Sequence, residues 1–382
     1  MRILLVSHFY STHRSGIEIA AHQLAAALCR DAGFTVDWMA SDSDPAPANL
    51  PPGLRCLPAR SWNWIERRTG LPCPLWSPGA LARLWRAVGD CEALHLHDCV
   101  YMGNVAAWLF AKLRGKPVLV TQHISAIPYD KWLARWLLSL LNHTLVRVML
   151  SRVDRVAFYS PVVQEYFRAR CRFRAPPAFI ENGVDADVFS YADAARGAAL
   201  RRAAGRDPAR PLVLFAGRFV PRKGIDIVLA MARGLRNVDW ILAGDGPLRP
   251  ENAELPHVRV IRGRQSAQLA ELYQMADLLV LPSRGEGFPL VVQEAMACGT
   301  PAMVGRETAE GCPAIRPLLL VEDVTGEQAA AAWQVRVAGL LGDPGVLRAL
   351  RAKVAEAARA QWSWPAAAAR YAMLFGELGR PR

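Results

Sequence analysis

The chain has 382 residues, of which 52% are hydrophobic and 21% charged, and its formal net charge at pH 7 is +12. This length suits two domains of about 150 to 200 residues, and the composition excludes an intrinsically disordered chain and a small disulfide scaffold. The excess of positive charge indicates acidic partners, such as phosphates, nucleic acid or anionic lipid.

Short apolar runs rich in β-branched residues alternate with amphipathic segments along the chain, a pattern typical of parallel α/β sheets. In the first half we expect strands at 2–7, 34–40, 93–97, 118–123, 155–160 and 179–181, and helices notably at 16–30, 103–113 and 132–153. In the second half we expect strands at 212–216, 240–243, 258–262, 278–282, 302–305 and 318–321. Each series predicts one doubly wound domain.

The expected domains are 1–187 and 188–362, joined by a polar connector at 185–211 that contains one short helix. The alternative is that this connector is a surface excursion of one larger domain. Apolar residues within 363–382 have helical spacing, and we expect that helix to return to the first domain. Ligands bind at the carboxyl ends of the strands in open α/β sheets, so two facing sheets predict an active site in the cleft between them.

Two cations follow the first strand of the second domain, in the segment FAGRFVPRKGID. The guanidinium fork of Arg218 and the ammonium of Lys223 can hold a diphosphate. For this segment taken alone, a solvated basic turn is the alternative.

A second segment, LPSRGEGFPLVVQEAMACGTP, places a glycine-rich turn before a helix that begins near Pro289. Free amides near Leu290 and Val291, together with the helix dipole, form an anion site. Glu286 and Glu294 can accept hydrogen bonds from neutral hydroxyls, as the acidic residue on the ribose does in dinucleotide-binding folds. A ligand with hydroxyls at both ends and a diphosphate between them is a nucleotide sugar. Either glutamate alone would be an ordinary surface carboxylate.

Four motifs occur along the chain in this order: IENGVD, GRFVPRKG, LAGDGP and GEGFPLVVQEAMACGTP. With them the chain resembles the retaining glycosyltransferases of family 4 over nearly its whole length. The resemblance implies the GT-B fold, an α/β architecture of two Rossmann-like domains, the first binding the acceptor and the second the donor. It also implies transfer from a UDP- or GDP-sugar with no metal or other cofactor.

The resemblance assigns the donor diphosphate to Arg218 and Lys223, the donor sugar to Glu286 and the ribose to Glu294. It places Gly263 near the nucleobase. The residues that it implies for the phosphate cradle are Phe288, Pro289, Leu290 and Val291, and it counts Gly287 among the donor-binding residues.

In the first domain the family usually has two glycines beside the phosphates, where this chain has Ser15 and Gly16. Because the Cβ atom of Ser15 restricts φ and close approach, the resemblance assigns this place only to Gly16. His123 matches the family's histidine beside the point of sugar transfer. Asp98 is a candidate contact near the acceptor. A metal site in LHLHDC is not expected, because residues two apart on a strand share a face, and His97 and Asp98 do not.

The segment VGRETAEGCPAIRP after Pro301 departs from the family, which has a glycine pair followed by Pro-Glu, so sugar specificity stays open. No carboxylate of the first domain stands out as a covalent nucleophile. We therefore expect the leaving group to depart and the acceptor to attack on one face of the sugar, with the donor phosphate accepting the acceptor proton.

The alternative function is that of a sugar-nucleotide epimerase of the same architecture. Nucleic acid is not an expected partner, because the charge is scattered and no recognised module is present.

The eight cysteines include no C-x-x-C pair, and no apolar run with a cleavage site opens the sequence, so we expect a cytoplasmic protein.

Segment 127–153 brings Trp132, Trp136, Leu137 and Leu140 together at helical spacing among basic residues, and segment 60–76 again has tryptophans beside basic residues. A helix that lies in an anionic headgroup layer needs these features.

We therefore expect peripheral binding to the inner face of a bacterial membrane. The expected acceptor is a lipid-linked saccharide or a precursor of the lipopolysaccharide core. If the helix is instead buried, a soluble acceptor is the alternative.

Overall fold

The structure, a computed structural model, describes the chain except residues 14–15, 65–67, 69–73, 124–135, 137–138, 265–266, 286–288 and 379–382. The chain forms two compact units, which are considered one at a time. Unit 1 comprises Met1–Gly183 and Trp364–Arg382, and unit 2 comprises Val184–Ser363. The expected boundaries at 187 and 363 thus differ slightly from those of the structure.

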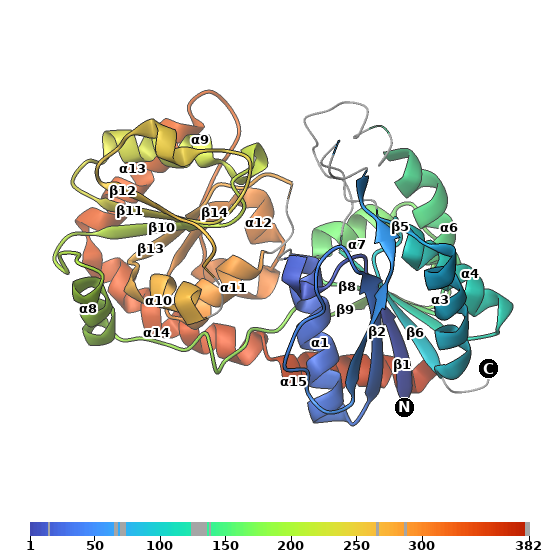
Figure 1. Cartoon of the computed structure of the whole chain (residues 1–382). Coiled ribbons are helices and arrows are strands. Elements are labelled where there is room, and N and C mark those ends of the chain that lie inside the picture. Colours follow the sequence, from blue (N-terminus) through green and yellow to red (C-terminus); the bar gives the residue numbers. More distant parts are fainter. Residues whose placement is uncertain are drawn as a thin grey trace. The chain divides into compact units, whose positions relative to one another are not determined.

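The sheet of unit 1 is parallel throughout (Figure 1). Its strands, in spatial order, are β3 (Leu54–Ala59), β2 (Thr35–Ser41), β1 (Arg2–Val6), β6 (Ala93–His97), β7 (Val118–Gln122), β8 (Arg155–Phe158) and β9 (Ala178–Phe179). A short antiparallel pair joins β4 (Ser61–Trp62) to β5 (Leu75–Trp76). Strand β3 was not expected, since Arg55 and Pro58 interrupt its apolar pattern; it lies at the edge of the sheet, where a proline is tolerated.

The helices of unit 1 cover both faces of this sheet (Figure 1). They are α1 (Gly16–Ala32), α3 (Pro78–Asp90), α4 (Met102–Leu113), α6 (Arg147–Arg152), α7 (Pro161–Arg168) and α15 (Trp364–Leu378), with short turns η1 (Ser11–His13) and η2 (Asn142–Val146). Successive side chains of a strand point to opposite faces. Accordingly, Ile3 and Leu5 of β1 pack in the cluster with α1 and α15, and Leu4 and Val6 pack in the cluster with α3 and α4.

A helix was expected at 132–153. Residue 136 and residues 139–152 are described and helical, and the π-helical turn η2 interrupts the α-helix before α6. The C-terminal helix α15 lies in unit 1, where Tyr371 and Phe375 are buried against the cluster that contains β1.

Unit 2 has a second parallel sheet. Its strands, in spatial order, are β12 (Val258–Ile261), β11 (Asp239–Ala243), β10 (Leu212–Ala216), β13 (Leu278–Leu281), β14 (Ala302–Gly305) and β15 (Leu320–Glu322). Its helices are α8 (Ala194–Ala203), α9 (Ile225–Gly234), α10 (Ala267–Met275), α11 (Leu290–Ala297), α12 (Arg306–Glu310), α13 (Ala329–Gly342) and α14 (Pro344–Gln361), with turns η3 (Pro221–Lys223), η4 (Pro250–Ala253) and η5 (Pro313–Leu318). Strand β15 begins later than expected because the turn η5 extends to Leu318.

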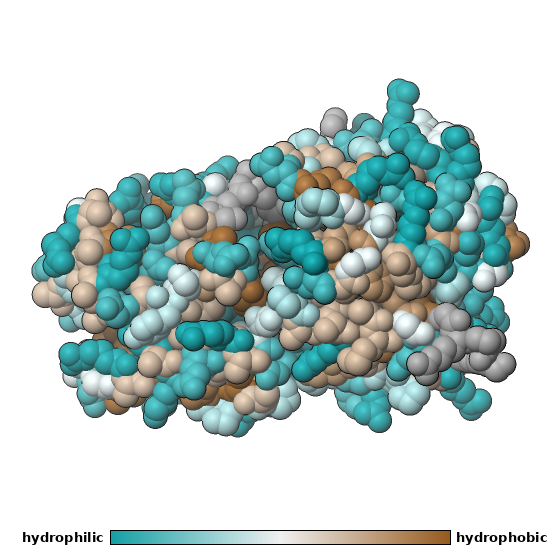
Figure 2. Space-filling view, turned by 90° about the horizontal axis from the view of Figure 1, so that it is seen from below, coloured by the Kyte–Doolittle hydropathy of each residue, from teal (hydrophilic) through white to brown (hydrophobic). Residues whose placement is uncertain are grey.

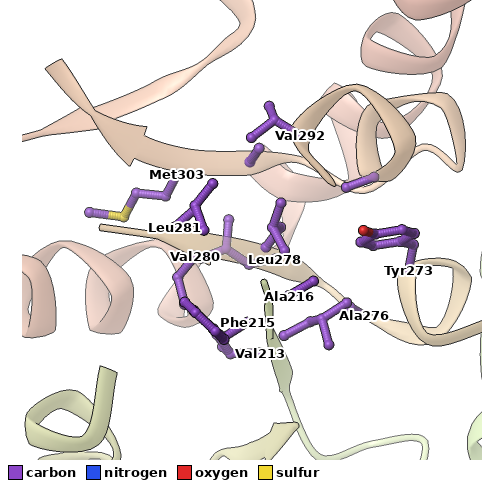
Figure 3. Packing of buried hydrophobic residues seen from close by; sticks show 14 of the residues in the cluster. Val213, Phe215, Ala216, Tyr273, Ala276, Leu278, Val280, Leu281, Val292 and Met303 are labelled. Carbon is purple, nitrogen blue, oxygen red and sulfur yellow. The ribbon is translucent and has the colours of Figure 1, made fainter. Parts of the chain in front are cut away.

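The central strands of unit 2 are apolar on both faces. Val213 and Phe215 of β10 pack among Leu278, Val280 and the side chains around them (Figure 3). The connector expected at 185–211 belongs to this unit. Arg201 of α8 anchors it, because its guanidinium donates to the carbonyl of Met275 at 2.7 Å and pairs with Asp277 at 2.7 Å. A buried, paired arginine accounts for the packing of a segment whose composition suggests a linker.

Each sheet reverses its strand order once, between β1 and β6 in unit 1 and between β10 and β13 in unit 2. In doubly wound folds the carboxyl ends of the strands at such a reversal form the ligand-binding crevice. In unit 1 these ends lead to His8 and Asp98. In unit 2 they lead to Gly217 and Pro282.

Candidate active site

The basic turn after β10 packs closely against the end of β13. Gly224 has φ +71°, and a Cβ atom there would lie 2.2 Å from the carbonyl oxygen of Pro282, so glycine is needed for this approach. The amide of Arg284 donates to the carbonyl of Arg222 at 2.8 Å. These contacts bring the turn that carries Lys223 next to the start of the glycine-rich loop.

The two cations of this turn differ in exposure. Arg218 is exposed, whereas Lys223 is 8% exposed in the turn η3. An exposed guanidinium can close over a bound diphosphate, while a buried ammonium is a fixed charge beneath it. The structure thus places both predicted cations in one turn at the carboxyl end of β10.

The LAGDGP segment joins the same edge. The amide of Phe219 donates to the carbonyl of Asp245 at 2.8 Å, and Gly263 donates to the Asp245 carboxylate at 3.1 Å. The guanidinium of Arg262 lies 4.8 Å from the centre of the Phe219 ring. Gly263, predicted near the nucleobase, therefore lies beside the loop that follows β11, and a Cβ atom there would meet nothing within 4 Å.

Helix α11 carries the second predicted carboxylate. Pro289 precedes it in an extended conformation, and Leu290 and Val291 form its partly buried start. Oε2 of Glu294 accepts a 2.9 Å hydrogen bond from the hydroxyl of Tyr273. Burial raises the pKa of Glu294 to about 7, and the hydrogen bond from Tyr273 acts in the opposite direction.

Tyr273 is a site residue that the sequence did not reveal. It lies in α10, 21 residues before Glu294, and its ring is fully buried, so a sequence pattern shows only a core aromatic. Figure 3 shows the ring beside the apolar core, with its hydroxyl oxygen at the far end from the backbone.

Glu286, Gly287 and Phe288 lie outside the described residues, and their predicted roles stay predictions. The residue before them is held firmly, since the amide of Gly285 donates to Oε2 of Glu307 at 2.9 Å. Glu307 belongs to α12, within the segment that departs from the family. The segment that departs from the family thus fixes the backbone of Gly285, the residue before Glu286.

In unit 1, His123 follows β7 and lies against His97, the last residue of β6. Nδ1 of His97 and Nε2 of His123 are 3.0 Å apart, and the rings stack with centres 5.2 Å apart. Both side chains are buried, at 1% and 4% exposure. Burial lowers the pKa of His123 to about 3 and that of His97 well below its usual range, so both rings are neutral near pH 7.

Asp98 holds the backbone of His123. Its φ is +65°, a strained value for a residue other than glycine, and Oδ1 accepts a 2.8 Å hydrogen bond from the His123 amide. Its side chain is fully buried. The structure therefore gives Asp98 a positioning role, and the contact with an acceptor stays a prediction. Across the described residues, no group of three or more His, Cys, Asp or Glu side chains has the arrangement of a metal site.

Gly16 is the exposed first residue of α1, its predicted place beside the phosphates stays a prediction, and Ser15 lies outside the described residues. Trp132 and Leu137 of the segment expected at a membrane also lie outside them. In the same segment, Trp136 is 56% exposed and Leu140 is 43% exposed.

The surface of the molecule is mixed in polarity. Figure 2 shows one face on which hydrophilic side chains predominate and apolar areas lie between them. Among the helices that the structure describes, none combines the length and the hydropathy needed to cross a bilayer.

Sequence comparison identifies two matching families. Residues 14–188 match the pattern of Glycosyltransferase Family 4, and residues 198–357 match that of glycosyl transferases group 1. A D-inositol 3-phosphate glycosyltransferase of Thermobispora bispora is 30% identical over 78% of this chain and 76% of its own length. One of Segniliparus rotundus is 32% identical over 70% of this chain, which spans 63% of that relative.

Solved structures share the fold. Sucrose-phosphate synthase of Thermosynechococcus elongatus has a TM-score of 0.77 and 22% identity, with 99% of each chain covered. HepE of Anabaena, in complex with UDP-glucose, has a TM-score of 0.74 and 16% identity, with 99% of this chain and all of that one covered. At these identities the likeness establishes two doubly wound domains of the GT-B type.

Proposed function

The chain belongs to glycosyltransferase family 4, and we propose that it transfers a sugar from a UDP- or GDP-sugar to an acceptor hydroxyl with retention of configuration. The observation that supports this proposal is that the segment with Arg218 and Lys223 follows β10 and the helix with Glu294 follows β13, the two strands between which the strand order of unit 2 reverses. A diphosphate needs the two cations, and a ribose needs the carboxylate. UDP-glucose is the ligand named for HepE, a protein of the same fold.

Charge develops on the diphosphate as the bond from the anomeric carbon to its oxygen breaks. In this proposal, Arg218, Lys223 and the amides that begin α11 stabilise that charge. The acceptor oxygen forms the new bond on the same face of the sugar, and its proton passes to the leaving phosphate oxygen. Two carboxylates close to the strand-order reversal of unit 1, Glu18 and Asp98, are buried, so neither is an exposed nucleophile. No metal or other cofactor is part of this scheme.

A phosphorylated polyol is the acceptor class that the relatives favour, since they are named D-inositol 3-phosphate glycosyltransferases. A soluble acceptor of this kind replaces the lipid-linked saccharide as the first candidate.

Exposed aromatic side chains keep the lipid-linked acceptor as a second candidate. Trp62 and Trp64 are 53% and 55% exposed, and Trp136 is 56% exposed. Residues 131–174 contain nine basic and two acidic residues, a balance that favours an anionic surface. Peripheral binding at the inner membrane would bring the acceptor within reach of unit 1.

The test combines donor and acceptor panels. Mass spectrometry of the ligand retained from a mixture of UDP- and GDP-sugars identifies the donor. Transfer is then measured with inositol phosphates and with lipid-linked saccharides, and an incubation without acceptor checks that no new nucleotide sugar forms, as an epimerase would produce. The proposal fails if no nucleotide sugar is retained, or if Lys223→Ala and Glu286→Ala both leave donor hydrolysis and transfer unchanged.

Vesicle binding separates the two acceptor classes. Co-sedimentation with vesicles of phosphatidylglycerol and phosphatidylethanolamine at low salt is expected if the acceptor is lipid-linked. Trp62→Ser with Trp136→Ser should then abolish it, while Trp240→Phe, a change in the core of unit 2, should not. If the wild type ignores these vesicles, or the double variant still binds them, the membrane assignment is overturned.

A further inference from the structure

We propose that His97 is a positioning residue that sets the tautomer of His123. Its Nδ1–H donates to Nε2 of His123, so that neutral His123 carries its own proton on Nδ1 and offers it to a substrate oxygen. The substrate contact rests on the proposed function, whereas the tautomer does not. His123 thereby acts as a hydrogen-bond donor and not as a general base.

The pairing of the two rings follows from the sheet. His97 of β6 lies beside Thr121 in β7. His123 comes two residues after Thr121, directly after the end of β7. Nδ1 of His97 and Nε2 of His123 lie 3.0 Å apart, which is a hydrogen-bond distance. Because Nε2 of His123 is occupied, any ligand contact of this ring must use Nδ1.

The direction of the hydrogen bond follows from the other nitrogen of His97. Nε2 of His97 is buried and has no hydrogen-bond partner among the described residues. A buried N–H without an acceptor is rare in native structures, so this nitrogen carries a lone pair and the proton of His97 is on Nδ1. Nε2 of His123 must then accept, which leaves the proton of His123 on Nδ1.

Burial keeps the pair neutral. Both rings lie in unit 1 with little contact with water, and burial lowers the pKa of each. Asp98 accepts a hydrogen bond from the backbone amide of His123 through Oδ1, and Tyr159 contributes a ring 5.1 Å from that of His123. A neutral ring with its lone pair already used cannot remove a proton from an acceptor. Its remaining N–H can orient a sugar hydroxyl or stabilise a developing charge.

His95 is the matched control for His97. It lies two residues earlier on the same strand and face, and it is equally buried. Its Nε2 bonds instead to Oγ1 of Thr121 at 2.8 Å, which in turn bonds to the hydroxyl of Tyr371 at 2.9 Å. A change at His95 therefore removes a buried imidazole without removing the partner of His123.

The tautomer is read directly from the free enzyme. Protein labelled with ¹⁵N-histidine gives separate Nδ1 and Nε2 signals for each ring, and His123→Gln identifies those of His123. At pH 7 we expect a protonated Nδ1 and a bare Nε2. A proton on Nε2, or an imidazolium, would overturn the proposal.

Kinetics then test the consequence. In His97→Leu we expect the single tautomer of His123 to be lost and kcat to fall by about tenfold, with the affinity for UDP unchanged. His97→Asn, whose amide nitrogen takes the position of Nδ1, should recover most of the loss. His95→Leu should lower thermal stability but leave the His123 signals unchanged. Equal activity of the Leu and Asn variants would contradict the role of the hydrogen bond.

These arms separate the two proposals. If the wild type bound no nucleotide sugar, the proposed function would fail, and the spectrum would still decide the tautomer. If the wild type transferred sugar but His123 carried its proton on Nε2, only the inference about His97 would fail.

Discussion

The hydroxyl of Tyr273 donates a 2.9 Å hydrogen bond to Oε2 of Glu294 and so connects α10 to the helix that begins at the proposed phosphate site. The contact places a donor on a carboxylate whose pKa burial raises to about 7. Near neutral pH this carboxylate changes from a protonated to an ionised state in the unliganded protein. A ribose needs the ionised form, since that form accepts hydrogen bonds on both oxygens.

Donor affinity should therefore depend on pH. We expect the affinity for the UDP- or GDP-sugar that the enzyme binds to increase between about pH 6 and pH 8, as Glu294 loses its proton. Isothermal titration with an intact nucleotide sugar avoids the separate titration of a terminal phosphate. In Glu294→Gln the affinity should be weaker and flat over the same range; a parallel increase in this variant would assign the pH dependence to another group.

Tyr273→Phe should move this transition to higher pH. Removing the hydroxyl removes the hydrogen bond that lowers the pKa of Glu294 and leaves the raising effect of burial. The variant should bind the donor about tenfold more weakly at pH 7 and recover at about pH 9. A purely structural role for the ring predicts weaker binding at both pH values, and that pattern would refute the assignment.

Removal of either cation should reduce the rate of sugar transfer much more than it reduces the stability of the fold. We expect Lys223→Ala and Arg218→Ala each to lower kcat/KM by about a hundredfold, because each removes a group that stabilises the leaving diphosphate. Arg222→Ala, in the same turn, is the matched control and should have a smaller effect. Steady-state kinetics, with melting temperatures for each variant, make the comparison; equal losses at all three positions would argue for a general effect of charge.

Gly224→Ala should destabilise unit 2 by more than about 2 kcal/mol. The new Cβ atom would meet the carbonyl oxygen of Pro282 at 2.2 Å in addition to the cost of the left-handed backbone. Gly205 has a similar φ of +69°, but a Cβ atom there would meet nothing within 4 Å, so Gly205→Ala should cost only about 1 kcal/mol. Urea unfolding of both variants measures the difference, and similar values would mean that the loop adjusts to remove the clash.

The fold was predictable because its strands are short apolar runs that differ sharply from the helices around them. The expected strands at 93–97, 212–216 and 302–305 coincide with β6, β10 and β14. Strand β3 was missed because an edge strand tolerates Arg55 and Pro58, which a buried strand would not. The family and fold predictions are confirmed by the matched families and the solved structures.

The side-chain partners of the site were not predictable in the same way. The sequence identified Glu294 and His123 through motifs, but their partners Tyr273 and His97 carry no motif and lie more than twenty residues away. Only the register of β6 against β7, and the packing of α10 on α11, bring each pair together. The strained φ of Asp98 is equally invisible to residue type.

Unit 1 is completed by a helix that the ribosome makes after all of unit 2. Helix α15 follows Ser363, and its Tyr371 and Phe375 cover apolar residues of β1 and α1 that are synthesised first. During translation those early residues stay uncovered until residues 364–378 have emerged, whereas Val184–Ser363 is already whole. A nascent chain of this protein therefore finishes its second half before its first, and a nonsense mutation near residue 363 would leave the first half without part of its core.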